Sequence, residues 1–144
     1  MSSTPDISRS PAAFGGRAAT WFRILMWAGI AANVVIAAIA IAHTEAVLAF
    51  LHLEMAQPLV WPRFAAFLLI LLSIFYIPSA IDPIVHRYSA IVSIICRAGG
   101  VGFFTIVGGR YIVFGLFDLS FGLPQAILLA LAWSSARRAR EPGP

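Results

Sequence analysis

Charged residues are scarce in this chain. Only 11% of its 144 residues are charged, whereas soluble domains carry about a quarter. Lysine is absent, so all ten basic residues are arginine. The net charge of +4 could indicate nucleic-acid binding, but these arginines gather at chain ends and at the ends of apolar segments. That placement is typical of a membrane protein and not of a nucleic-acid surface.

Cysteine is nearly absent as well. Cys96 is the single cysteine, which excludes an internal disulfide and a cluster of metal-binding thiolates. We interpret it as a small buried apolar residue. The abundance of alanine, together with the use of arginine and never lysine, suggests a bacterium with GC-rich codon usage.

Long apolar segments dominate what is present. Hydrophobic residues make up 60% of the chain, and four segments are each about long enough to cross a bilayer. The predicted spans are residues 20–42, 62–81, 88–107 and 111–133. Short connections between them predict an all-α integral membrane domain, an up-down-up-down bundle of four helices over residues 20–135. Residues 1–19 are predicted to be a flexible cytoplasmic tail, and residues 136–144 a basic cytoplasmic tail.

One amphipathic segment lies outside the spans. In residues 43–57, apolar side chains recur at helical spacing between polar ones. The segment is too short to cross, so we expect a short helix on the outer membrane interface. Seven arginines fall on the side of the two chain ends and only two, Arg63 and Arg110, on the other. This asymmetry predicts cytoplasmic termini in a multi-pass protein of the bacterial inner membrane.

Two charged residues fall inside predicted spans. Counted from the turn at Gly108 and Gly109, Arg97 lies roughly 16 Å along its helix and Asp118 roughly 13 Å along the next. Matching depths on neighbouring antiparallel helices predict an ion pair, because an unpaired charge is costly in lipid. The pair either fastens the two helices together or forms a polar intramembrane site. Gln125 could extend a polar track from Asp118.

Glycines concentrate in the third span. Gly99, Gly100 and Gly102 would let another helix approach closely, either within the bundle or in another subunit. The histidines His43, His52 and His86 fall at opposite membrane boundaries, so no two can sandwich a haem within the bilayer. We predict no metal site and no catalytic residues.

Two stretches carry a family resemblance. One is Tyr-Ile-Pro-Ser-Ala-Ile-Asp-Pro at residues 76–83, followed by Arg87, Tyr88 and Arg97, and the other is Gly-Leu-Phe-Asp-Leu at residues 115–119. Over about residues 20–135, the chain resembles the broad DoxX-like group of small four-helix bacterial membrane proteins.

The resemblance implies that Asp82, Arg97 and Asp118 are recurring polar positions of that group. Some members are membrane subunits of quinone-reducing redox enzymes, although this chain lacks the cysteines of a thiol-redox role. We therefore expect a non-catalytic accessory or anchoring subunit, without a cofactor, that contacts lipid and other membrane subunits. The alternative is a component of a quinone-linked redox enzyme, with quinone bound near Arg97 and Asp118.

Overall fold

A computed structural model describes residues 16–138, and every regular element in that range is helical. The elements in chain order are α1 (Gly16–Ala42), α2 (Thr44–Phe50), α3 (Val60–Ile81), α4 (Arg87–Val107), the 3₁₀ turn η2 (Gly109–Tyr111) and α5 (Ile112–Arg138). Most of the two predicted tails lies outside the described residues.

The prediction of four membrane-spanning helices is confirmed in its coarse form. α1, α3, α4 and the combined η2–α5 segment are each long and apolar enough to cross a bilayer. The first and the last of these helices are longer than the sequence predicted, since α1 already begins at Gly16 and α5 continues to Arg138. Alanine, leucine and arginine are good helix formers, so the helices extend past the apolar segments into polar flanks.

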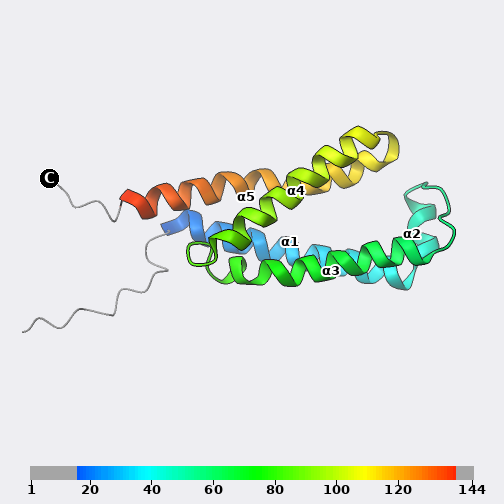
Figure 1. Cartoon of the computed structure of the whole chain (residues 1–144), viewed down its shortest axis with the longest axis horizontal. Coiled ribbons are helices and arrows are strands. Elements are labelled where there is room, and N and C mark those ends of the chain that lie inside the picture. Colours follow the sequence, from blue (N-terminus) through cyan, green and yellow to red (C-terminus); the bar gives the residue numbers. More distant parts are fainter. Residues whose placement is uncertain (1–15, 139–144) are drawn as a thin grey trace, which may run out of the picture.

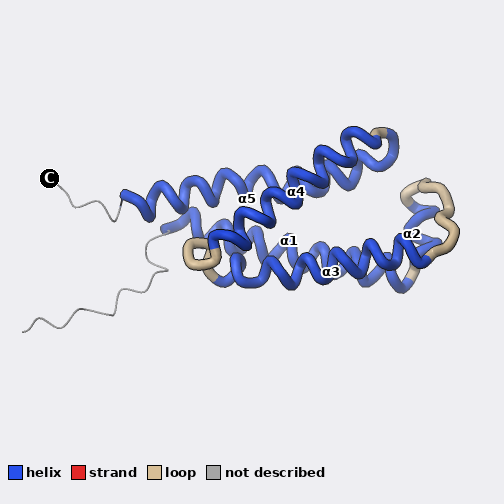
Figure 2. Tube along the Cα trace, viewed as in Figure 1, coloured by secondary structure: helices blue, strands red, loops and turns tan. Residues whose placement is uncertain are grey.

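The long helices form two hairpins that diverge toward one end (Figure 1). α1 packs along α3 and also along α5, and α4 packs along α5, whereas α3 and α4 touch over a shorter length. The connections all lie at the two ends of the assembly, and α2 occupies the end at which the hairpins separate (Figure 2). α1 is therefore the helix that joins the two hairpins.

The amphipathic segment is only partly helical. α2 ends at Phe50, so the second half of the predicted segment 43–57, including the apolar Met55, lies in the following loop. The backbone leaves the helical conformation at His52, whose φ of 53° is left-handed. Pro58 further disfavours helix at the residue before it.

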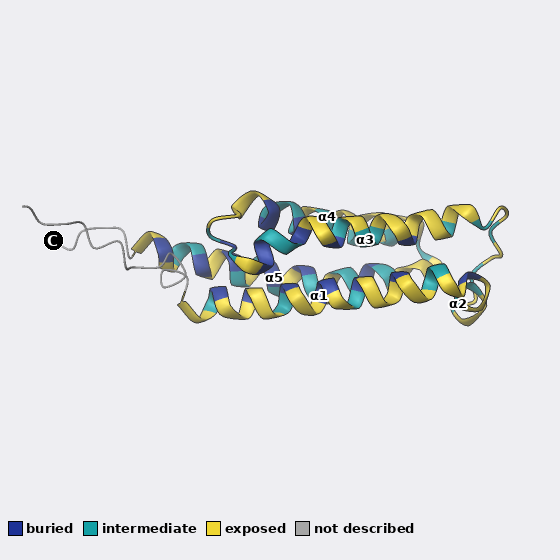
Figure 3. Cartoon of the chain, turned by 90° about the horizontal axis from the view of Figure 1, so that it is seen from below, coloured by how far each residue is buried: buried dark blue, intermediate teal, exposed yellow. Residues whose placement is uncertain are grey.

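Burial is concentrated at the end opposite α2. A core of Phe22, Met26, Tyr76, Ala90 and Leu129 joins all four long helices there. Beyond Arg97, α4 has no buried residue. Exposed residues cover most of the helical surface (Figure 3), and most of them are the apolar side chains that a bilayer would solvate.

Candidate functional site

The structure brings Arg97 and Asp118 together. Nη1 of Arg97 lies 3.2 Å from Oδ1 of Asp118, and the Arg97 side chain is only 3% exposed while that of Asp118 is 24% exposed. The guanidinium also lies over the ring of Phe121, 5.0 Å from its centroid. An ion pair and a cation–π contact thus share the one arginine, which compensates part of the cost of burying its charge.

Glycines on three helices make room for this pair. A Cβ on Gly29 of α1 would lie 2.7 Å from Nη2 of Arg97, and one on Gly122 of α5 would lie 3.1 Å from its Cβ. A Cβ on Gly100 of α4 would collide with the Asp118 carboxylate. The arginine therefore occupies space that any side chain at these positions would fill.

The ion pair uses only part of the hydrogen-bonding capacity of Arg97. Its Nε and Nη2 atoms are buried and have no acceptor among residues 16–138. Three further buried atoms share this condition within the same range: Asn33 Oδ1, Tyr76 OH and Gln125 Oε1. Buried polar groups are almost always hydrogen-bonded, so each of these atoms lowers the stability of the fold unless a water molecule or a ligand binds it.

The helices that carry these polar residues also carry residues that pack against the ion pair or against the apolar core. Asn33 follows Gly29 by one turn on the buried face of α1. Gln125 follows Gly122 by one turn on α5, and its Nε2 lies 3.8 Å from Sδ of Met26 on α1. Tyr76 of α3 belongs to the apolar core that includes Met26. We call Asn33, Tyr76, Arg97, Asp118 and Gln125 the intramembrane polar cluster.

Asp82 does not join this cluster. It follows the last residue of α3, and its Oδ1 accepts hydrogen bonds from the backbone nitrogens of Ile84 (2.8 Å) and Val85 (3.0 Å). This geometry is an Asx-type turn that starts the connection to α4. Asp82 therefore stabilises the turn. It is also remote from Arg97, which lies roughly 15 Å along α4 from Arg87, the first residue of that helix.

The three glycines of α4 have different surroundings. Gly100 points toward Asp118, as described above, whereas a Cβ on Gly99 or Gly102 would meet nothing within 4 Å. Both of these residues lie on the exposed surface of α4. The structure thus divides the predicted packing glycines into one internal position and two open ones.

The histidines stay apart from the cluster. His43 and His52 flank α2 and His86 precedes α4, so they lie at opposite ends of the long helices. No group of three or more histidine, cysteine or carboxylate side chains within the described range could hold a metal ion.

Sequence reasoning missed Asn33, Tyr76, Gly29 and Gly122. Asn33 carried a usable signal, because it is a lone amide within an apolar segment of α1. Tyr76 entered only as the first residue of the stretch 76–83, which gave no sign that its side chain is just 1% exposed. The two glycines gave no signal, since their role depends on which helix packs against Arg97.

No known family, characterised protein or solved structure matches this chain in the comparisons made at the level of family, sequence and fold. The geometry of the cluster and of the helix surfaces therefore carries the functional argument.

Proposed function

We propose that this chain is a non-catalytic integral membrane subunit that packs against, or anchors, a larger complex in the bacterial inner membrane. The observation that carries the proposal is the open face of α4 beyond Arg97. That half of the helix buries no residue, and Gly99 and Gly102 present bare backbone there. Close approach of a second helix is the principal use of such positions in lipid.

The proposal includes an orientation and a family. At one end, where α1 begins, α4 begins and α5 ends, these elements carry Arg17, Arg23, Arg87, Arg137 and Arg138. At the other end, Arg63 donates to Thr44 Oγ1 (3.1 Å) and Arg110 to the carbonyl oxygen of His52 (2.8 Å), both beside α2. The positive-inside rule then favours cytoplasmic termini, four alternating spans and α2 on the outer interface. Membership of the DoxX-like group belongs to the same proposal.

Substitution on the open face of α4 tests the subunit role. Gly102→Leu should release a co-purifying membrane protein from the tagged chain at native expression, while the chain itself remains in the membrane. Ala65→Leu is the matched control, because it adds the same side chain to an exposed position of α3. Wild-type protein that purifies alone, or equal loss of the partner in both variants, would argue against the proposal.

A quinone-linked redox role is the second candidate, and the unused nitrogens of Arg97 favour it. Nε and Nη2 are buried donors without an acceptor in the described chain, and a quinone carbonyl oxygen is an acceptor. This role predicts that quinone can be extracted from gently purified wild-type protein and is lost from Arg97→Gln. Stoichiometric quinone in a chain that purifies without a partner would favour this role over the first.

A further inference from the structure

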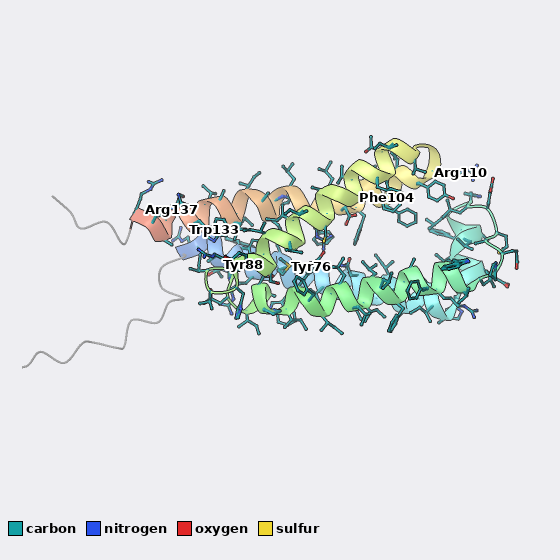
Figure 4. The ribbon with its side chains drawn as sticks, viewed as in Figure 1. Tyr76, Tyr88, Phe104, Arg110, Trp133 and Arg137 are labelled. Carbon is teal, nitrogen blue, oxygen red and sulfur yellow. The ribbon has the colours of Figure 1, made fainter. Side chains whose placement is uncertain are left out.

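A hollow lies at the end of the assembly where α4 begins and α5 ends. Its volume is about 200 Å³, and its lining residues are Ile84, Arg87, Trp133, Ala136 and Arg137. One water molecule accounts for about 30 Å³ of liquid, so the hollow has room for a group several times larger. Figure 4 shows Trp133 and Arg137 on the last turns of α5, with Tyr88 of α4 at the same end.

Two guanidinium groups line this hollow, and that of Arg87 also lies over the ring of Tyr88, 5.2 Å from its centroid. Neither Arg87 nor Arg137 forms a hydrogen bond or an ion pair with another residue in the range 16–138. Arg23, at the same end, differs because its Nε donates to the carbonyl oxygen of Ala80 at 3.4 Å. Asp82 pairs with neither arginine, because the only ion pair among the described residues is Arg97–Asp118.

The rest of the lining is apolar. Ile84, Trp133 and Ala136 supply the wall, and Ala136 is only 6% exposed. Tryptophan favours the headgroup level of a bilayer, with its ring against hydrocarbon and its N–H toward polar groups. Two cations beside an apolar wall at the end of a spanning helix match a ligand that is anionic at its head and apolar below it.

We propose that this hollow binds the phosphate group of an anionic glycerophospholipid. Arg87 and Arg137 donate charge-assisted hydrogen bonds to the phosphate oxygens, with one arginine on each helix of the α4–α5 hairpin. Ile84 and Trp133 contact the glycerol and the first carbons of the acyl chains. A bound lipid would thereby link the start of α4 to the end of α5, independently of the Arg97–Asp118 pair.

Native mass spectrometry of the full chain in mild detergent tests this site. Delipidated protein is titrated with phosphatidylglycerol and, separately, with phosphatidylcholine. We expect one phosphatidylglycerol to bind in preference to phosphatidylcholine. The double variant Arg87→Gln, Arg137→Gln should weaken that binding by at least about tenfold, as expected for the loss of charge-assisted hydrogen bonds.

Two further variants separate a site from general surface charge. Arg17→Gln with Arg138→Gln removes the same charge at the same end but no residue of the hollow, and it should change binding by less than about twofold. Ile84→Trp fills the hollow, keeps both arginines and should weaken binding as the double variant does. Circular dichroism confirms that each variant is folded.

Three results would overturn the proposal. They are equal weakening in the Arg17/Arg138 control, no preference of the wild-type chain for the anionic lipid, and full binding by Ile84→Trp. A fourth outcome concerns the source of the anion: displacement of the lipid by inorganic phosphate at a similar concentration would assign the hollow to a free anion instead.

Discussion

Gly100 of α4 lies directly against the carboxylate of Asp118 on α5. An added Cβ at this position would collide with Oδ2 of Asp118 and would lie 3.0 Å from its Cγ. The carboxylate that pairs with Arg97 therefore rests on bare backbone.

Gly100→Ala should consequently destabilise the protein. The added methyl group displaces the Asp118 carboxylate and lengthens its ion pair with Arg97, and overpacking of this kind costs about 1–3 kcal/mol. Gly99→Ala is the control on the neighbouring residue, where a Cβ meets nothing within 4 Å. There the change should be neutral or stabilising by up to about 1 kcal/mol, because alanine favours helix. Thermal unfolding in detergent measures both, and equal effects would contradict the described contact.

Arg97 and Asp118 should show strong energetic coupling. Removing one partner leaves the other charge uncompensated, which costs about 3–5 kcal/mol for a buried pair. Asp118→Ala leaves Arg97, which is only 3% exposed, and should cost about that much, whereas Arg97→Ala leaves Asp118, which is 24% exposed, and should cost less. The double variant should be more stable than the less stable of the two single variants.

A double-mutant cycle on the same unfolding assay measures this coupling. Strictly additive effects of the two single substitutions would rule out a direct pair.

Removing the hydroxyl of Tyr76 should cost little in protein free of bound ligand. The hydroxyl is buried without a partner among residues 16–138, so Tyr76→Phe deletes a desolvated group and should leave stability unchanged or raise it by about 1 kcal/mol. Ser89→Ala provides the contrast, since Oγ of Ser89 donates to the carbonyl oxygen of Phe75 at 2.8 Å between helices. Its loss should cost about 0.5–1.5 kcal/mol. A loss above about 2 kcal/mol for Tyr76→Phe would mean that the hydroxyl is hydrogen-bonded in the folded protein, to an internal water or to the neighbouring Cys96 thiol.

Cysteine labelling tests the orientation. In a Cys96→Ala background, cysteine at Ser135 should resist an impermeant thiol reagent in intact cells, because α5 is proposed to end in the cytoplasm. Cysteine at Ala56, in the loop between α2 and α3, should react. Permeabilised cells, in which both positions should react, provide the control, and the reverse pattern in intact cells would invert the proposed topology.

The sequence supported the apolar helices and the depth of the charged residues, because hydropathy and rise per residue are local properties. Arg97 and Asp118 flank the tight turn at Gly108, so counting along each helix was enough to place them at one level. Which face of a helix meets which neighbour is a property of the whole assembly. For this reason Gly29 and Asn33 of α1 were missed, although they approach or share a face with the site from a helix far away in sequence.

The divergence of the two hairpins was equally invisible in the sequence. A membrane provides no hydrophobic drive between helices, so an apolar segment has the same pattern whether it faces a helix or lipid. The three glycines of α4 show that the sequence could not tell an internal position from an exposed one, since one of them is internal and two are open. The extent of α2 was overestimated because its apolar spacing continues past the residue at which the backbone leaves the helix.

The placement of Arg97 has a consequence for biosynthesis. Its ion-pair partner in the described chain, Asp118, lies on the following helix, and Gly29, which accommodates its guanidinium, lies on the first. A ribosome delivers α4 before Asp118 has emerged, and a lone arginine enters hydrocarbon poorly. We therefore expect the insertion machinery to hold α4 until α5 arrives and to release the two into lipid as one unit, beside an α1 that is already in place.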